Sequence, residues 1–198
     1  SFPTRRSSDL RVTLFGESHG PAVGAVIDGL PPGLKTDAAY IRRELEKRSA
    51  RGSISTARKE ADALELLSGV KNGFTEGTPL ALIIRNTDAD PGAYSVMERV
   101  ARPSHADYTA QAKYLGFQDV CGGGHFSGRL TAPLVAAGAI LKKALEDRGI
   151  LIGTHILSLY TEKDRPFEFE PKSDIQALNL AEFPAMPRHY RPKLHARP

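Results

Sequence analysis

The sequence predicts an α+β fold with an aliphatic core. Short runs rich in Val, Ile, Leu and Ala alternate along the chain with segments of helical period. Forty per cent of the 198 residues are hydrophobic, whereas only 7% are aromatic and Trp is absent. The longest apolar run, at residues 134–141, is far shorter than the ~20 residues that cross a bilayer. These observations indicate one compact domain or two small ones, and no membrane partner.

Five segments have the residue preferences of strands, and the first two flank a tight Ser-His-Gly-Pro turn. The expected strands lie at residues 11–15, 22–29, 64–70, 80–85 and 150–159. Three further segments have helical character, and the last is the clearest because its apolar residues recur at helical spacing. The expected helices lie at residues 37–47, 106–114 and 131–148.

Cap residues support two of these helices. Thr36 or Asp37 is expected to cap the first, because a side-chain oxygen at this position accepts from free backbone N–H groups. Thr131 is expected to cap the last helix, with Pro133 in its first turn and Gly149 after its end.

The positive charge is concentrated at the two ends of the chain. The whole sequence carries a net charge of +4, but residues 11–184 hold 21 basic and 22 acidic side chains. A nucleic-acid partner is therefore not expected, because such binding uses a basic stripe on a folded face. Residues 1–10 have no apolar period and are interpreted as a foreign or disordered leader. Residues 185–198 are rich in Pro and bases, and are interpreted as a disordered or frame-shifted tail.

The chain has one cysteine, Cys121. A single cysteine excludes an internal disulfide framework and is typical of a reducing compartment. The expected location is therefore the cytoplasm.

The first segment with chemical character is GESHGPAVGAVIDGLPPG at residues 16–33. His19 lies there on a turn of small residues, next to Glu17, with room for a ligand above it. Histidine donates and accepts protons near neutral pH, so His19 is a candidate general acid or base. The alternative is an ordinary surface histidine that bonds to the backbone.

The second segment is basic and covers residues 42–59, with seven bases in eighteen residues. Arginine side chains bind phosphate and carboxylate oxygens in pairs, so Arg48 and Arg51 are candidates for an anion site. The alternative is a solvated helix face followed by a polar loop.

The third segment combines RPSHADY (102–108) with GGGHFSGRLT (122–131). His105 is expected at a loop-to-helix junction, and the three glycines are expected to let the backbone approach a ligand closely. Ser127 and Arg129 offer a hydroxyl and a positive charge near a helix start. No GK[ST] follows the glycines, so this is not a P-loop, and a purely structural turn is the alternative. The histidines lack the spacing of a metal motif, so no metal is expected.

Together these segments resemble the chorismate synthases. GESHGPAVGAVIDGLPPG fits the first signature of that family, and GGHFSGRLTAPLVAAGAI fits its second. The segments STARKEAD, LELLSGVKNGFTEGTPLALIIRNTDA and RPSHADYTAQAKY are also similar to family segments, in the same order. The resemblance runs from about residue 11 to residue 184.

The resemblance implies a β-α-β sandwich core and a homotetramer in the full enzyme. It also implies a carbon–oxygen lyase that eliminates phosphate from 5-enolpyruvylshikimate-3-phosphate to give chorismate. The implied cofactor is reduced FMN, which is used without net redox change.

The resemblance also implies roles for individual residues. His19 matches the family histidine near the leaving phosphate, and His105 matches the one near the flavin. His125 and Phe126 match a flavin-contacting pair. The implied contacts with phosphates or carboxylates are Arg48, Arg51, Arg102, Ser127 and Arg129.

The chain departs from the family pattern in three places. The loop at residues 48–55 is one residue shorter than usual, and Cys121 stands where the family often has Arg. The family's later segments, which carry a catalytic aspartate and a flavin-binding Lys-Pro-Thr, are absent. We therefore expect residues 11–184 to be the N-terminal part of a chorismate synthase that is inactive as this chain. The alternative is a non-catalytic phosphate- or flavin-binding module.

Overall fold

The computed structural model describes residues 10–49, 61–87, 100–167, 171–181 and 183–186. The chain divides into two compact units, Ser1–Ala144 and Leu145–Pro198, which are described separately below. The expected leader and tail lie outside the described residues, apart from Leu10, Ala185 and Met186. No helix in the described ranges is long and apolar enough to cross a membrane.

The first unit is built on a four-stranded antiparallel sheet. Its strands occur in the spatial order β1 (Arg11–Gly16), β2 (Ala22–Asp28), β6 (Leu80–Arg85) and β3 (Leu64–Ser68). The β1–β2 hairpin pairs Gly16 with Val23, and β2 pairs Ala22 with Arg85 of β6. The turn after β1 and the end of β6 therefore meet at the same end of the sheet.

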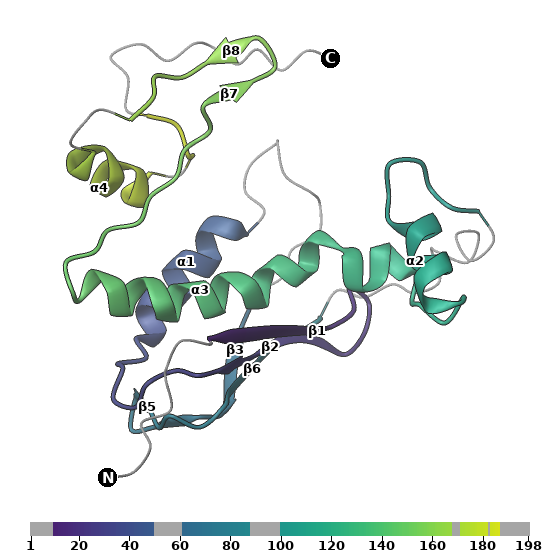
Figure 1. The fold of residues 1–198 in the computed structure, drawn as a ribbon, viewed down its shortest axis with the longest axis horizontal. Coiled ribbons are helices and arrows are strands. Elements are labelled where there is room, and N and C mark those ends of the chain that lie inside the picture. Colours follow the sequence, from purple (N-terminus) through teal and green to yellow (C-terminus); the bar gives the residue numbers. More distant parts are fainter. Residues whose placement is uncertain (1–9, 50–60, 88–99, 168–170, 182, 187–198) are drawn as a thin grey trace. The chain divides into compact units, whose positions relative to one another are not determined.

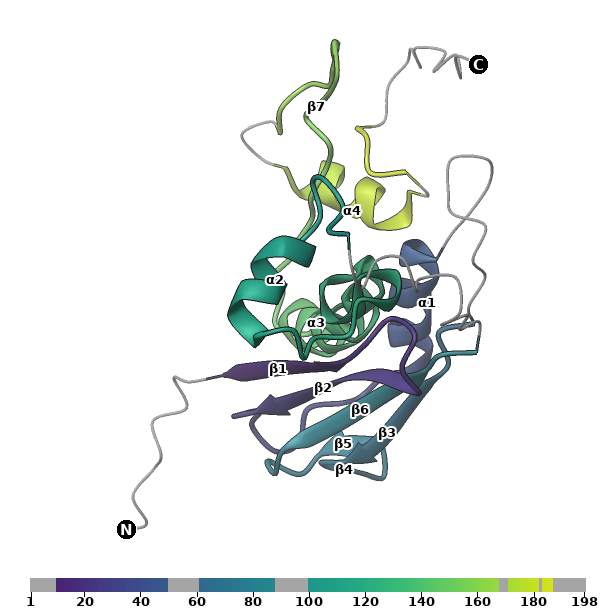
Figure 2. The same ribbon diagram turned by 90° about the vertical axis from the view of Figure 1, so that its right-hand side faces the viewer.

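Alternation of side chains gives this sheet one fully buried face. Along β2 and β6, every second side chain has no exposed surface, as expected where successive residues point to opposite faces. Helices α1 (Ala38–Arg48) and α3 (Thr131–Glu146) lie over this face (Figure 2) and supply the other half of the core. The buried strand residues are Val23, Ala25, Ile27, Leu80, Leu82 and Ile84. The fold class is α+β, as the sequence predicts.

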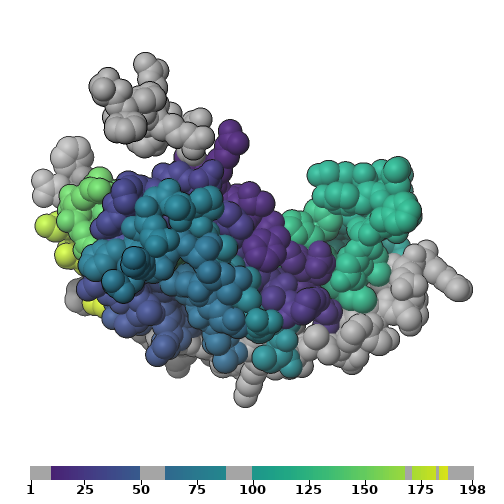
Figure 3. Space-filling view, turned by 90° about the horizontal axis from the view of Figure 1, so that it is seen from below, coloured from purple at the N-terminus to yellow at the C-terminus, as the bar shows by residue number. Residues whose placement is uncertain are grey.

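The opposite face of the sheet carries no described helix (Figures 1 and 3). Phe15 lies on it and covers Gly24, because a Cβ placed on Gly24 would lie 2.3 Å from the Phe15 Cζ. The side chains of Phe15 and Leu67 are 39% and 58% exposed.

Helix α1 begins as the sequence predicts. The Asp37 carboxylate accepts from the Tyr40 backbone N–H at 3.0 Å. This hydrogen bond favours the ionised form and lowers the pKa of Asp37.

Helix α3 begins differently from the prediction. A 3-10 turn, η4 (Gly128–Leu130), precedes it, and the Ser127 side chain caps that turn by accepting from the Arg129 N–H at 3.3 Å. Thr131 is therefore not the cap. Its hydroxyl donates to the Gly128 carbonyl at 2.5 Å. The prediction was wrong because the helical backbone starts one turn earlier than the apolar period.

The predicted strand at 64–70 is two short strands. β3 ends at Ser68, and Gly69 (φ +80°) directs the chain into a separate hairpin of β4 (Val70–Lys71) and β5 (Phe74–Thr75). A Cβ at Gly69 would lie 2.5 Å from the Leu80 Cα. The turn therefore needs glycine both for its backbone conformation and for its close approach to β6.

The second unit contains β7 (Ser158–Leu159), β8 (Glu162–Lys163) and α4 (Lys172–Leu180). The predicted strand at 150–159 was wrong except for its last two residues. Within the described part of this unit, the preceding segment packs on α4 rather than pairing, since a Cβ at Gly153 would lie 2.8 Å from Ile175 Cγ2. Helix α4 was not predicted.

Candidate active site

The loop that carries His19 is held at the end of the sheet by Asn86, the first residue after β6. The Asn86 side-chain amide donates to the carbonyls of Glu17 (3.0 Å) and Gly20 (2.7 Å), and its backbone N–H donates to the Pro21 carbonyl (3.2 Å). Its Oδ1 accepts from Arg129 Nε at 2.9 Å. One amide therefore connects the histidine loop to the buried arginine.

The three glycines lie in η3 (Cys121–Phe126), and each of them has a positive φ. The space beside Gly122 is filled by the His19 ring: a Cβ there would lie 2.5 Å from His19 Cδ2 and Nε2. The space beside Gly123 is filled by the His105 ring, with Cε1 2.8 Å from the same constructed position. The two imidazoles thus lie against successive residues.

Gly124 is close to the backbone rather than to a ring. A Cβ at this position would lie 2.0 Å from the Asp119 carbonyl oxygen. Protein atoms therefore occupy the Cβ direction of all three glycines.

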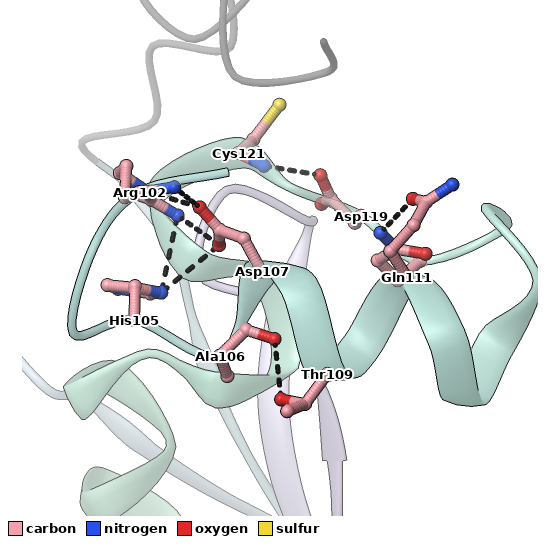
Figure 4. A network of polar contacts seen from close by, with 9 residues as sticks. Arg102, His105, Ala106, Asp107, Thr109, Gln111, Asp119 and Cys121 are labelled. Atoms are coloured by element: carbon pink, nitrogen blue, oxygen red, sulfur yellow. Dashed lines mark hydrogen bonds and ion pairs between the residues drawn. The ribbon is translucent and has the colours of Figure 1, made fainter. Parts of the chain in front are cut away.

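His105 belongs to a cluster at the start of α2 (Asp107–Tyr114), shown in Figure 4. The Asp107 carboxylate accepts from Arg102 Nε (2.7 Å), Nη2 (2.8 Å) and backbone N–H (3.0 Å). The guanidinium holds the pKa of Asp107 well below its usual range, against the opposing effect of burial. His105 Nδ1 lies 3.1 Å from Asp107 Oδ1. The same Nδ1 lies 3.4 Å from Arg102 Nη2. A carboxylate only accepts and a guanidinium only donates, so these two contacts favour opposite tautomers of the imidazole.

Cys121 is next to this cluster, but its sulfur points away from Arg102 and Asp107 (Figure 4). Its backbone N–H donates to Asp119 Oδ1 at 2.8 Å. In Figure 4, Cys121 thus contacts Asp119 through its backbone and not through its thiol.

Ser127 lies between the histidine loop and α3. Its hydroxyl donates to the buried Ser18 hydroxyl at 3.2 Å, although the two residues are 109 positions apart in sequence. The Ser18 backbone N–H donates to the Gly124 carbonyl at 3.1 Å. These contacts fix the loop that carries His19 against the glycines.

His125 and Phe126 extend the site with aromatic surface. His125 Nδ1 is 3.1 Å from the Gly16 carbonyl, and its ring is perpendicular to that of Phe126, with the centroids 5.9 Å apart. Phe126 is 43% exposed and lies 6.2 Å from the Tyr114 ring. An exposed aromatic face of this kind is suited to stacking against a planar ligand ring.

Two arginines share one buried carboxylate. Arg129 donates to Asp62, and Arg48 Nη2 lies 3.4 Å from the other oxygen of the same group. The remaining Arg129 donors bind the Asn86 Oδ1 and the Arg85 carbonyl. The side chains of Arg129 and Asp62 are 4% and 3% exposed, whereas Arg48 is 22% exposed. Among the described residues, Asp62 is thus the carboxylate that both guanidinium groups face.

The structure therefore brings His19, His105 and Ser127 to one stretch of backbone, and Asn86 connects this stretch to Arg129. Arg102 is directed to Asp107 rather than to open solvent. Arg51 lies outside the described residues. No group of three possible metal ligands occurs among the residues that the structure describes.

The prediction of site residues did not include Asn86, Asp62 or Asp107. Asn86 directly follows β6, and Asp62 lies two residues before β3. Polar side chains next to strand ends often serve a site. Asp107 follows His105 by two residues at a helix start, where a carboxylate is favoured.

Fold and site together define an α+β protein that gathers imidazole, hydroxyl and guanidinium groups at one end of an antiparallel sheet. The chorismate synthase family model matches residues 10–188. The chain belongs to the chorismate synthase family.

Individual relatives agree with this assignment. The chain is 54% identical to the chorismate synthase of Aeropyrum pernix over 149 residues, which are 75% of this chain and 39% of that protein. It is 55% identical to that of Bordetella petrii over 150 residues (75% and 42%), and 42% identical to that of Methanocella arvoryzae over 185 residues (90% and 50%). A crystal structure of a chorismate synthase matches with a TM-score of 0.63 and 31% identity, over 89% of this chain and 48% of that one. The chain thus spans half the length of these relatives or less.

Proposed function

We propose that this chain supplies the N-terminal part of a chorismate synthase active site. The reaction is a 1,4-elimination of phosphate from 5-enolpyruvylshikimate-3-phosphate, in which one ring loses a phosphate and a proton. The observation that supports it best is the placement of His19 and His105 against successive glycines, beside the Ser18–Ser127 hydroxyl pair. In this proposal the complete enzyme is a homotetramer.

His19 serves the leaving phosphate. A phosphate group departs more readily when a neighbouring group donates a proton to it or stabilises its charge. The Asn86 hydrogen bonds fix the loop on which the imidazole stands, so the ring is positioned before the substrate binds.

His105 serves the flavin side of the site. Its Nδ1 lies beside both the Asp107 carboxylate and the Arg102 guanidinium, and these two contacts orient the ring. Arg102 also binds Asp107 directly, so the three side chains support one another.

Arg48 and Arg129 attract the anionic substrate. Both guanidinium groups face Asp62, and Arg48 is the more exposed of the two. Arg48 therefore makes the direct contact with a phosphate or carboxylate, and Arg129 contributes its charge from a buried position. Arg51 belongs to the same proposal by its resemblance to the family.

Reduced FMN is the proposed cofactor, and when bound it supplies electron density to the elimination without net redox change. The residues present fit a flavin, because Phe126 exposes an aromatic face and Tyr114 and His125 flank it.

Anaerobic chorismate formation with reduced FMN tests the proposal. We expect no turnover by this chain alone, and turnover once it is joined to the C-terminal part of the Aeropyrum pernix enzyme. In the joined protein, His19→Ala or His105→Ala should lower the rate by roughly 10²–10⁴-fold, the usual contribution of a positioned acid or base.

Arg48→Ala in the joined protein should chiefly raise KM. The expected loss of binding free energy is about 1.5–3 kcal/mol. Lys71→Ala is the control, because it removes a positive charge from the exposed β4–β5 hairpin. Full activity of the His19→Ala protein would refute the role proposed for His19 at the leaving phosphate. Flavin binding without turnover by the joined protein would instead favour a non-catalytic module.

A further inference from the structure

Gly122 and Gly123 each face one imidazole. A Cβ at Gly122 would lie 2.5 Å from both Cδ2 and Nε2 of His19, and a Cβ at Gly123 would lie 2.8 Å from Cε1 and 3.3 Å from Nε2 of His105. Real Cβ atoms are essentially never found within 3.0 Å of such neighbours. Neither position can accept a side chain while its imidazole stays in place.

Both rings turn the edge that carries Nε2 toward this dipeptide. Their other contacts come from different parts of the fold. Asp107 holds His105 at Nδ1, whereas Asn86 holds the loop of His19 through the Glu17 and Gly20 carbonyls. The dipeptide is therefore a backbone element that contacts both rings.

We propose that Gly122 and Gly123 are positioning residues for the two histidines. Each glycine provides the surface against which one imidazole packs. The peptide bond between them sets the distance between the two Nε2 edges. The catalytic consequence rests on the proposed function, but the placement of the rings does not.

A purely conformational role for these glycines is the competing explanation. Gly122 and Gly123 have φ values of +58° and +93°, where a Cβ is strained whatever surrounds it. Gly73 separates the two explanations, because it has φ +79° but no heavy atom within 4 Å of its constructed Cβ. Gly73→Ala therefore introduces the backbone strain without a contact.

Histidine ring resonances of the 198-residue chain provide the direct measurement. Cε1–Hε1 and Cδ2–Hδ2 signals are assigned with His19→Gln and His105→Gln. We expect Gly122→Ala to shift the His19 signals, Gly123→Ala to shift the His105 signals, and Gly73→Ala to shift neither. Unchanged ring signals in both site variants, or equal shifts in all three, would overturn the proposal.

Double-mutant cycles on the unfolding equilibrium give a second measurement. The unfolding constant of the double variant Gly122→Ala, His19→Ala should be at least about threefold smaller than the two single changes predict when added. Gly122→Ala combined with His105→Ala should be additive, and the pattern should be reversed for Gly123→Ala. Additivity in every pair would contradict the proposal.

The proposal can also be tested if Gly122→Ala does not fold. Adding His19→Ala must then restore the fold, because it removes the atoms that the new Cβ meets. Failure to restore the fold would count against the proposal. Neither measurement uses turnover, so failure of the proposed function would leave these results intact.

Discussion

Asp62 is the one described carboxylate that two site arginines share. It lies between Arg129 and Arg48, is 3% exposed, and adopts φ 45°, a conformation that Asn and Asp tolerate better than most residues. Removing the charge of one member of a buried ion pair costs more than the net contribution of the intact pair.

Asp62→Asn should therefore lower the free energy of unfolding by about 3–5 kcal/mol, as measured by denaturant titration. The substitution conserves size and backbone conformation, so the loss reports the charge. Glu65→Gln is the matched control, because its partner Arg85 is 59% exposed and solvent screens such pairs. An effect of Asp62→Asn no larger than that of the control would show that the buried arginines need no counter-charge.

The sequence identified the histidines and arginines but not the groups that hold them. His19, His105 and Ser127 stand in distinctive motifs, whereas Asn86 acts through backbone carbonyls 66 and 69 positions away. A hydrogen bond to a backbone carbonyl does not depend on the side chain of the partner residue, so no sequence motif indicates it. The role of Asn86 can be recognised only when the register of β2 and β6 is known.

At the scale of elements, α3 offers a clean test of glycine. Gly138 is exposed in the middle of the helix, and a Cβ there would meet no heavy atom within 4 Å. Gly138→Ala should raise the free energy of unfolding by about 0.5–1 kcal/mol, because alanine restricts the unfolded chain and favours the helix.

Gly24→Ala in β2 is the opposing case. Its Cβ would lie 2.3 Å from Phe15 Cζ and 2.6 Å from the Leu82 carbonyl oxygen, so the variant should be destabilised. Thermal and denaturant unfolding of the two variants provide the comparison. A destabilised Gly138→Ala would mean that the helix surface is covered by something in solution.

The start of α2 predicts a pH dependence. Arg102 keeps the pKa of Asp107 well below its usual range, so the unfolded chain takes up this proton at higher pH than the folded chain does. The stability from ionised Asp107 is therefore complete above the ordinary aspartate pKa of about 3.9. It is lost as the pH falls from there toward the folded value.

Asp107→Asn lacks this contribution at every pH. The difference in unfolding free energy between the natural chain and the variant should therefore shrink below about pH 4, while other carboxylates cancel in the comparison. Unfolding titrations at several pH values supply the measurement, and a difference that does not change with pH would contradict the assignment.

Sequence patterns predicted the elements best where burial alone decides the outcome. β1, β2, β6, α1 and α3 contribute to one core, and their periods reflect it. The segment at 150–159 has equally strong strand preferences, but strand preference requires a neighbour with which to pair. In the described part of its unit, Gly153 faces α4 instead. The sequence does not contain that information locally.

At the scale of the molecule, the two units should differ in local stability. The core cluster lies in the first unit, whereas the buried hydrophobic residues described in the second are Leu178 and Met186. Amides with few buried neighbours open more readily. Hydrogen exchange should therefore be slowest in β2 and β6 and faster by orders of magnitude in β7, β8 and α4. Equal protection in both units would contradict this expectation.

The contact between Ser18 and Ser127 has a consequence for the order of folding. It joins positions 109 residues apart, and the His19 ring contacts Gly122 across a similar separation. Contacts between such distant positions form slowly, because the entropy of closing a long loop must be overcome before the contact contributes. The sheet and helix α1 can condense first, because α3 joins this core across an equally long stretch of chain. His19 reaches Gly122 only when α3 docks. Signals from His19 would therefore report a late step of assembly, and a stopped-flow experiment would find them lagging behind the formation of the sheet.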